Sequence, residues 1–203
     1  MEAREEMLAA LRRGARDVTL PDVSKLGVKF PDPVRQYGDS LKSVGGTCLR
    51  VADRQAADRA LGELPVYRDA KRVVSLVPGV GAGGLDLGAV SDPHDLEGLD
   101  VAVLPGAIAV AENGAVWVDG SVLAHRAVFV IPEHLVLVVD ESAIVNDLHE
   151  AYARLAERAI GYGVFIAGPS KTADIELALV IGAQGARSCT VLVVGPERDR
   201  PSI

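Results

Sequence analysis

The sequence predicts an α/β fold in which a mainly parallel sheet is flanked by helices. Short runs that are apolar throughout, such as "RVVSLV" and "HLVLVVD", alternate with amphipathic segments of helical period. Strands of this kind are buried on both faces, and parallel sheets obtain that burial from covering helices. Aromatic residues make up only 4% of the chain, so its core must consist of Val, Leu, Ile and Ala, as in most buried parallel sheets.

The N-terminal residues predict an arm with two helices. The first helix spans residues 1–13, with acids before bases, as the helix dipole favours, and an apolar stripe at Met7, Leu8 and Leu11. A proline-containing stretch, "GARDVTLPDVSKLGVKFPDP", follows and is expected to run extended over the surface. The second helix is predicted at 33–43. We therefore expect one domain over residues 1–203, with residues 1–45 as an N-terminal helical arm.

The rest of the chain is expected to alternate strands with helices. The segments 127–131 and 135–139 both read as strands, and the link between them is too short for a parallel crossover. They are expected to form an antiparallel hairpin or to occupy different positions in the sheet. The other expected elements are a strand "TCLRV", a helix after an Asp53 cap, a strand "RVVSLV", a helix at 147–159, a strand "VFIAG", a helix at 173–181 and a final strand "CTVLVVG".

Composition excludes several classes of function. The net charge is -7, the pI is about 5.1, and no block of Lys or Arg stands out, which argues against binding to nucleic acid or to a membrane surface. No run approaches the roughly 18 apolar residues of a membrane span. The N-terminal helix lacks the continuous apolar region of a signal peptide. We therefore expect a cytoplasmic protein without a membrane span.

The chain offers few residues for a metal or cluster. Its two cysteines, Cys48 and Cys189, lie in apolar, strand-like runs and are expected to be buried thiols. Two thiolates cannot supply the four ligands of an iron–sulfur cluster. No histidine has metal-site spacing to another His or Cys, so we expect no cofactor bound by this chain alone and an unidentified small ligand. The histidines are His94, His125, His134 and His149.

A glycine-rich segment follows the strand "RVVSLV". Gly79, Gly81 and Gly84 match the spacing of a dinucleotide-binding fingerprint, which requires a helix to begin at the third glycine. The residues that follow, "LDLGAVSDPHDLEG", contain further glycines and a proline. They predict a flexible or substrate-covering loop instead.

A carboxylate lies beside a predicted tight turn. In "VAENGAVWV" the residues Glu112, Asn113 and Gly114 separate two apolar runs, and Asn-Gly favours a hairpin turn because both residues tolerate positive φ. One interpretation is an exposed Glu on a hairpin. The other is a nucleophile or base, which requires Glu112 to lie in a dry cleft.

The stretch "GPSKTADIE" predicts a second wall of a site. Gly168 ends a strand, and Ser170 or Thr172 can cap a helix whose first-turn N–H groups bind an anion or a hydroxylated ligand. An ordinary helix cap is the alternative. We expect Glu112 or Asp174 to transfer protons, and Lys171 to hold a small carboxylate. The candidate ligand-binding residues are Asn113, Gly114, Gly168, Ser170, Lys171, Thr172 and Glu176.

These motifs resemble a known family. "GPSKTADIE", followed by Gly182 and Gly185, looks like the C-terminal signature of the LUD-domain family, the lactate utilisation protein C family. "IAVAENGAVWV" is similar to its second signature, and "HRAVFVIPEHLVLVV" resembles its Arg…Pro…His segment. The resemblance covers roughly residues 98–195.

The resemblance implies a fold similar to that of the ribose-phosphate isomerase, glucosamine-phosphate deaminase and coenzyme A transferase superfamily. It implies a component of L-lactate oxidation to pyruvate that works with iron–sulfur partner proteins and binds a small carboxylate or a phosphate-bearing ligand. Two alternatives stay open. One is a stand-alone enzyme, either coenzyme A transferase-like through a Glu112 thioester or sugar-phosphate isomerase-like. The other is a scaffold subunit without chemistry.

Overall fold

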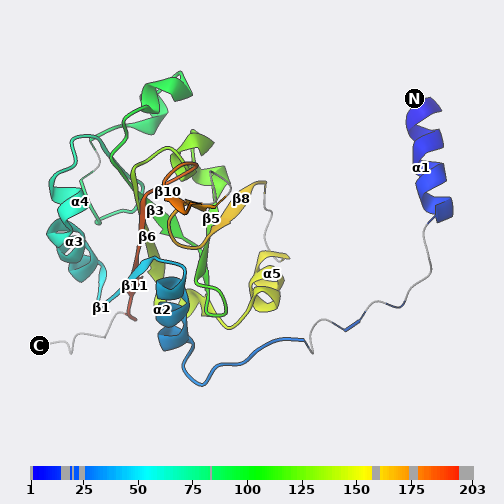
Figure 1. Ribbon diagram of the computed structural model, residues 1–203, viewed down its shortest axis with the longest axis horizontal. Helices are drawn as coiled ribbons and strands as arrows, with labels where there is room; N and C mark the ends of the chain where they lie inside the picture. The colour runs from blue at the N-terminus through cyan, green and yellow to red at the C-terminus, as the bar shows by residue number, and fades with distance from the viewer. Residues whose placement is uncertain are drawn as a thin grey trace, which may run out of the picture.

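The central layer of the protein is a five-stranded parallel sheet (Figure 1). The computed structural model describes residues 2–14, 19, 21–22, 26–82, 84–156, 161–173 and 178–196. The strand order is β1-β11-β6-β3-β2, and every pairing is parallel. The strands are β1 (Thr47–Val51), β2 (Val73–Ser75), β3 (Val101–Gly106), β6 (His134–Asp140) and β11 (Ser188–Val194).

A second, mixed sheet of four strands packs beside the first. Its order is β7-β4-β5-β8, with β4 parallel to β7 and antiparallel to β5. The predicted Asn-Gly turn is confirmed, because it joins β4 to β5 and Gly114 adopts a φ of 72°. The strands are β4 (Ile108–Val110), β5 (Ala115–Asp119), β7 (Ile144–Val145) and β8 (Gly163–Ile166).

Helices complete four layers. The helices α3 (Arg54–Glu63) and α4 (Pro65–Arg68) cover one face of the parallel sheet, where Ala57 and Leu61 join a buried cluster with strand residues. The other face packs against the mixed sheet and α2 (Pro33–Ser43), and α5 (Leu148–Ala156) covers the outer face of the mixed sheet. Figure 1 shows the layers in this order. The predicted α/β class is therefore confirmed, with a second sheet as an additional layer.

The predicted helix starts are also confirmed where caps mark them. Asp32 accepts a hydrogen bond from the Arg35 N–H at 3.0 Å and precedes Pro33, the first residue of α2. Asp53 accepts from the Ala56 N–H at 2.7 Å at the start of α3. Such caps contribute about 1 kcal/mol each. The remaining α-helix, α1 (Glu2–Gly14), lies apart from the sheets in Figure 1.

The strand expected at 127–131 is wrong. This segment contains a 3₁₀ turn, η5 (Arg126–Phe129), which buries Val128 and Phe129. The reason lies in the sheet. The strand β6 is already paired with β11 on one side and β3 on the other, so no edge remains for a hairpin partner.

The helix expected at 173–181 is also wrong in its described part. The short strand β10 (Val180–Ile181) pairs antiparallel with β9 (Lys171–Thr172). Leu179 and Ile181 remain 64% and 49% exposed, so this apolar run does not form the buried face of a helix. β-branched Val180 and Ile181 favour extended backbone.

The glycine-rich loop is confirmed as a loop. Between residues 84 and 98 the chain forms only short 3₁₀ turns, and no α-helix begins at the third glycine. No helix among the described residues is both long and apolar enough to cross a bilayer. Among the described residues, the 3₁₀ turns besides η5 are η2 (Leu87–Ala89), η3 (Pro93–Leu96), η4 (Gly120–Val122) and η6 (Glu141–Ala143).

Candidate functional site

Glu112 lies at the carboxyl ends of β4 and β7, next to the start of α5. Its backbone N–H donates to the Asn146 carbonyl at 2.9 Å, which extends the pairing of the two strands by one bond. Its side chain is exposed, and its Oε2 accepts from the Leu148 N–H, the first of α5, at 3.3 Å. An acceptor at a helix N-terminus is favourable. Glu112 therefore does not lie in the dry cleft that the predicted role as nucleophile or base requires.

The carboxylates at the start of α5 bind backbone N–H groups and a lysine. Asp147 is 2% exposed and accepts from the Glu150 N–H at 2.9 Å, while Glu150 accepts from the Asn146 N–H at 2.8 Å. This pattern resembles a capping box, except that Glu150 accepts from the N–H of the residue before the cap. Asp147 also accepts from the Val28 N–H at 2.9 Å, and Lys29 forms an ion pair with Glu150. The carboxylates here fasten the arm to α5.

The loop that begins at Gly168 lies against the end of α2. A Cβ built on Gly168, whose φ is 72°, would lie 2.9 Å from the Val44 carbonyl oxygen, so a larger residue does not fit there. A Cβ on Gly45 would lie 2.9 Å from Lys171 Nζ. A cation at this position suits the negative end of the helix dipole.

Ser170 connects this loop to the family's glycine pair. Its N–H donates to the Ala186 carbonyl at 2.8 Å, and its carbonyl accepts from the Gly182 N–H at 3.0 Å. Its hydroxyl accepts from the Gln184 N–H at 3.3 Å. The loop therefore lies beside the residues that lead into β11, at the amino ends of the parallel strands. Ligands of open α/β sheets lie at the opposite, carboxyl edge.

The two predicted motifs meet the same helix. The Ser40 hydroxyl donates to the Ala111 carbonyl at 2.7 Å, beside the Glu112 turn, and Val44, one turn further along α2, contacts Gly168. Four hollows among the described residues are lined by neither Glu112 nor the 168–172 loop. Asp174 and Glu176, the two acids expected beside this loop, lie outside the described residues.

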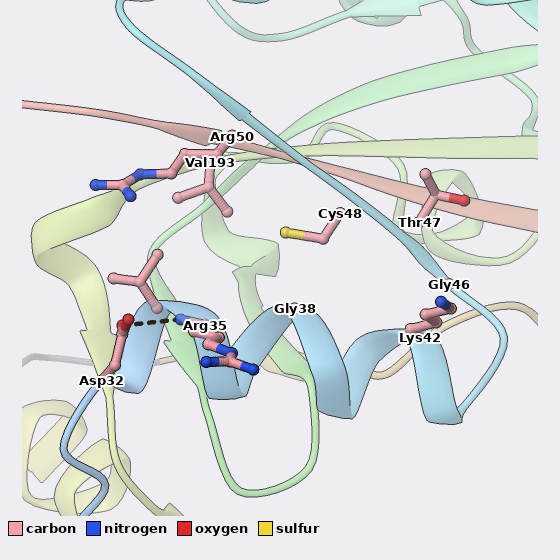
Figure 2. Close-up of a pocket in the computed structure, with 10 residues that line it drawn as sticks. Asp32, Arg35, Gly38, Lys42, Gly46, Thr47, Cys48, Arg50 and Val193 are labelled. Carbon is pink, nitrogen blue, oxygen red and sulfur yellow. Dashed lines mark hydrogen bonds between the residues drawn. The ribbon is translucent and has the colours of Figure 1, made fainter.

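A groove of about 440 Å³ lies between α2 and the edge strand β1 (Figure 2). Arg35 and Lys42 project from α2, and Arg50 projects from β1. Cys48 lies on the groove floor under Gly38, where a Cβ built on the glycine would lie 3.8 Å from its sulfur. The groove thus combines three cations, the Asp32 carboxylate and a thiol in a chain whose net charge is -7.

The groove cations differ in how far they are already paired. Arg50 forms a two-point ion pair with Glu141, at 2.7 and 2.8 Å. Arg35 lies 3.9 Å from Asp39, one turn along the helix. No ion pair of Lys42 occurs among the described residues. An anion entering the groove therefore meets Lys42 and Arg35 first.

Sequence reasoning missed this groove, although a signal was present. Residues 35, 38 and 42 recur at helical spacing on the flank next to the apolar stripe. Two cations on either side of a glycine on one flank of a helix predict a solvent-exposed face. It becomes a groove wall only because β1 crosses α2 at Gly38.

Tyr37, on the buried face of α2, lies close to the thiols of Cys48 and Cys189. Burial raises the pKa of Cys48, and it raises the pKa of Cys189 to about 12, although the Gly168 N–H acts in the opposite direction. Burial also raises the pKa of Tyr37, with the two nearby cysteines as further causes. The Tyr37 hydroxyl is buried without a hydrogen-bond partner. These groups stay protonated at neutral pH.

Within the described residues, no three His, Cys, Asp or Glu side chains are grouped to hold a metal ion. Three histidines have other partners. His94 pairs with Asp92 at 2.6 Å, the His125 ring contacts the Val90 carbonyl at 2.7 Å, and the His134 ring contacts the Ser188 hydroxyl at 2.8 Å. Each of these three rings is therefore engaged by a polar group of the fold.

Comparisons with a family model and with known proteins point to the same family. A family model described as the LUD domain matches residues 94–194. A lactate utilization protein C from Deinococcus radiodurans is 30% identical over 213 residues, which cover 96% of this chain and 96% of that protein. One from Shouchella clausii is 33% identical over 101 residues, 47% of this chain and 44% of that protein.

A solved structure shares the fold. The crystal structure of a DUF162 family protein from Deinococcus radiodurans superposes with a TM-score of 0.58 and 21% sequence identity. The superposition covers 83% of this chain and 99% of that one. The likeness therefore extends beyond the residues that the family model matches.

Proposed function

The chain belongs to the LUD-domain family, and we propose that it takes part in lactate utilisation. The observation that carries the proposal is the similarity to a lactate utilization protein C over 96% of both chains. In this proposal the protein is a non-redox component of L-lactate oxidation to pyruvate. Its two cysteines are too few for an iron–sulfur cluster, so the electrons pass to cluster-containing partner proteins.

For the ligand site we propose the groove between α2 and β1. A small carboxylate such as L-lactate would bind to Lys42 and Arg35, since a guanidinium matches a carboxylate in two-point geometry. Thr47, which also lines the groove, offers a hydroxyl beside them. The support for this site is a local excess of cations in an acidic protein, around a hollow of suitable size.

The binding test is a calorimetric titration with L-lactate, pyruvate and inorganic phosphate. Arg35→Gln combined with Lys42→Met should abolish heat of binding for the carboxylates. The matched control is Arg59→Gln, which removes an exposed cation of α3 on the other face of the sheet. Unchanged binding in the double variant, or equal loss in the control, would exclude the groove.

Cys48 provides an independent readout of occupancy. Its pKa is raised by burial, so alkylation should be slow at neutral pH and should accelerate as the pH rises toward that pKa. A ligand above the thiol should slow this reaction further. Cys189, which is buried and has a pKa raised to about 12, serves as an internal reference that stays unlabelled until the protein unfolds. Equal labelling of Cys48 with and without L-lactate would argue against binding in the groove.

The cellular role has its own test. Deletion of the gene should impair growth on L-lactate, and affinity purification of the full chain should recover an iron–sulfur protein. Rescue by the wild type but not by Glu112→Ala with Asp174→Ala would support the predicted proton-transfer residues. Full rescue by that double variant would remove them from the mechanism, while normal growth of the deletion strain would remove the lactate role.

A second candidate function is acyl transfer, because the exposed Glu112 carboxylate at the turn between β4 and β5 is accessible to a substrate, which would itself have to exclude water from it. This carboxylate would attack the carbonyl of an acyl-coenzyme A and release the thiolate, which then attacks the glutamyl carbonyl, frees the carboxylic acid and leaves a Glu112 thioester. Hydroxylamine trapping after incubation with acyl-coenzyme A should then label Glu112. Absence of labelling across a panel of acyl groups would exclude this function.

A further inference from the structure

We propose that α1 pairs in antiparallel fashion with α1 of a second copy of this chain. The helix carries an apolar stripe of Met7, Leu8 and Leu11, which are 66%, 36% and 66% exposed, and Arg4 lies on the same face one turn before Leu8. All its described side chains, from Ala3 to Gly14, are exposed, and Figure 1 shows it apart from both sheets. The protein's own core therefore does not cover this stripe.

An uncovered helix of this length requires a partner for stability. Isolated helices shorter than about 12–15 residues are marginal in water, and most helices are stabilised by packing of their apolar face. The helix α1 has 13 residues and only three large apolar side chains. A contact along its stripe is thus the expected source of its stability.

The charges beside the stripe identify a second copy as the partner. Glu5 and Arg12 are seven residues apart, two helical turns, and therefore occupy the same flank of the stripe. In an antiparallel pair, equal flanks face each other, so Glu5 of each helix meets Arg12 of the other. One helix thus carries both halves of a two-fold symmetric set of ion pairs.

The opposite flank supports the same orientation. It carries Ala3 and Ala10, also seven residues apart, whose small side chains allow two helices to approach closely. In a parallel pair each charged flank would face this alanine flank, and Glu5 and Arg12 would lose their partners. Antiparallel pairing places alanine against alanine and acid against base, with Met7 near Leu11 of the second helix.

The contact is small, so the association should be weak. A helix of 13 residues is about 20 Å long, and two of them bury far less than the roughly 1,200 Å² of a stable interface. We expect sedimentation velocity of the full chain over a concentration series to show a rise from 21.3 kDa toward twice that mass. A chain that stays monomeric at every concentration, in low salt, would overturn the proposal.

Charge exchange tests the orientation. Glu5→Arg alone and Arg12→Glu alone should each weaken the dimer about tenfold, because symmetry turns two attractive pairs into two repulsive ones. Mixing the two single variants should restore the affinity, and so should both changes in one chain. Leu11→Glu should abolish the dimer.

The matched control lies on the opposite face of the same helix. Glu6 and Arg13 are also seven residues apart but point away from the stripe, so Glu6→Arg and Arg13→Glu should leave the dimer unchanged. An equal loss in these controls, or no recovery in the mixture of Glu5→Arg and Arg12→Glu, would overturn antiparallel pairing. These variants change only exposed side chains, and near-ultraviolet circular dichroism checks that the fold is kept.

Discussion

Helix α2 has two faces with opposite properties. On one face Tyr37 and Leu41 are 0% exposed, and Ser40 bonds the Ala111 carbonyl beside the Glu112 turn. On the other, Arg35 and Lys42 form the wall of the groove. One short helix therefore carries a face that packs in the core and a face that we propose binds the ligand. Substitutions on the first face should lower the free energy of unfolding, whereas substitutions on the second should change only the affinity for an anion.

The largest effect is expected at Gly114, where the hairpin turn meets the buried face of α2. A Cβ at this position would lie 2.6 Å from the backbone N and Cα of Leu41, and the glycine has a φ of 72°. Gly114→Ala should lower the free energy of unfolding by about 3–5 kcal/mol, from left-handed backbone strain plus overpacking. Urea denaturation measures this.

Gly62→Ala is the matched control. Gly62 lies in α3, and a Cβ built there would meet nothing within 4 Å. Alanine should therefore stabilise the helix by about 0.5 kcal/mol or more. If the Gly114→Ala protein were as stable as the Gly62→Ala protein, the turn would be able to move away from α2. That result would contradict the assignment of this face of α2 to stability.

The next effect concerns Leu41, a fully buried side chain of the main core cluster. Leu41→Ala should lower the free energy of unfolding by about 2–5 kcal/mol, because apolar burial is lost and a cavity remains. Leu11→Ala, which truncates a leucine of α1 that is 66% exposed, should change the stability of the monomer by less than about 0.5 kcal/mol. A comparable loss in both variants would mean that α1 packs on the domain.

Substitution of Tyr37 by Phe should have a smaller effect on the free energy of unfolding, and of opposite sign. The tyrosine hydroxyl is buried without a partner, which costs free energy, and the rest of the ring is core. Tyr37→Phe removes the unpaired group and keeps the ring, so we expect stability to rise by about 1 kcal/mol. A loss of stability on thermal unfolding would show that the hydroxyl has a partner, such as a buried water.

The buried face of α2 could be predicted from the sequence, and the groove could not. Apolar residues at helical spacing identify a face that packs, whatever it packs against. The groove depends on β1 crossing α2 at Gly38. Parallel pairing with β11, in which Thr47 lies opposite Thr190, holds β1 in this position. Contacts between segments so distant in sequence leave no local pattern.

The same limit explains the two wrong elements. The run 127–131 is apolar and β-branched, but both edges of β6 were occupied by strands from elsewhere in the chain. The run 178–181 fitted a helix by its spacing, although a short apolar run cannot distinguish helix from strand. Ser170 or Thr172 was expected to cap a helix, but Lys171 and Thr172 form the strand β9. The position of this loop at the amino edge of the parallel sheet depends on long-range contacts to Ala186 and Val44.

The smallest effect on stability is expected on the groove face, and it completes the comparison. Arg35 and Lys42 are exposed, and the Arg35 ion pair with Asp39, at 3.9 Å, lies at the surface where such pairs contribute little. Arg35→Gln with Lys42→Met should therefore leave the free energy of unfolding within about 0.5 kcal/mol of the wild type. Removal of two like charges from one face even relieves repulsion, which offsets the loss of that pair. A stable double variant that no longer binds carboxylates would assign the groove face to ligand binding alone, whereas destabilisation by more than 1 kcal/mol would show that these cations hold α2 against β1.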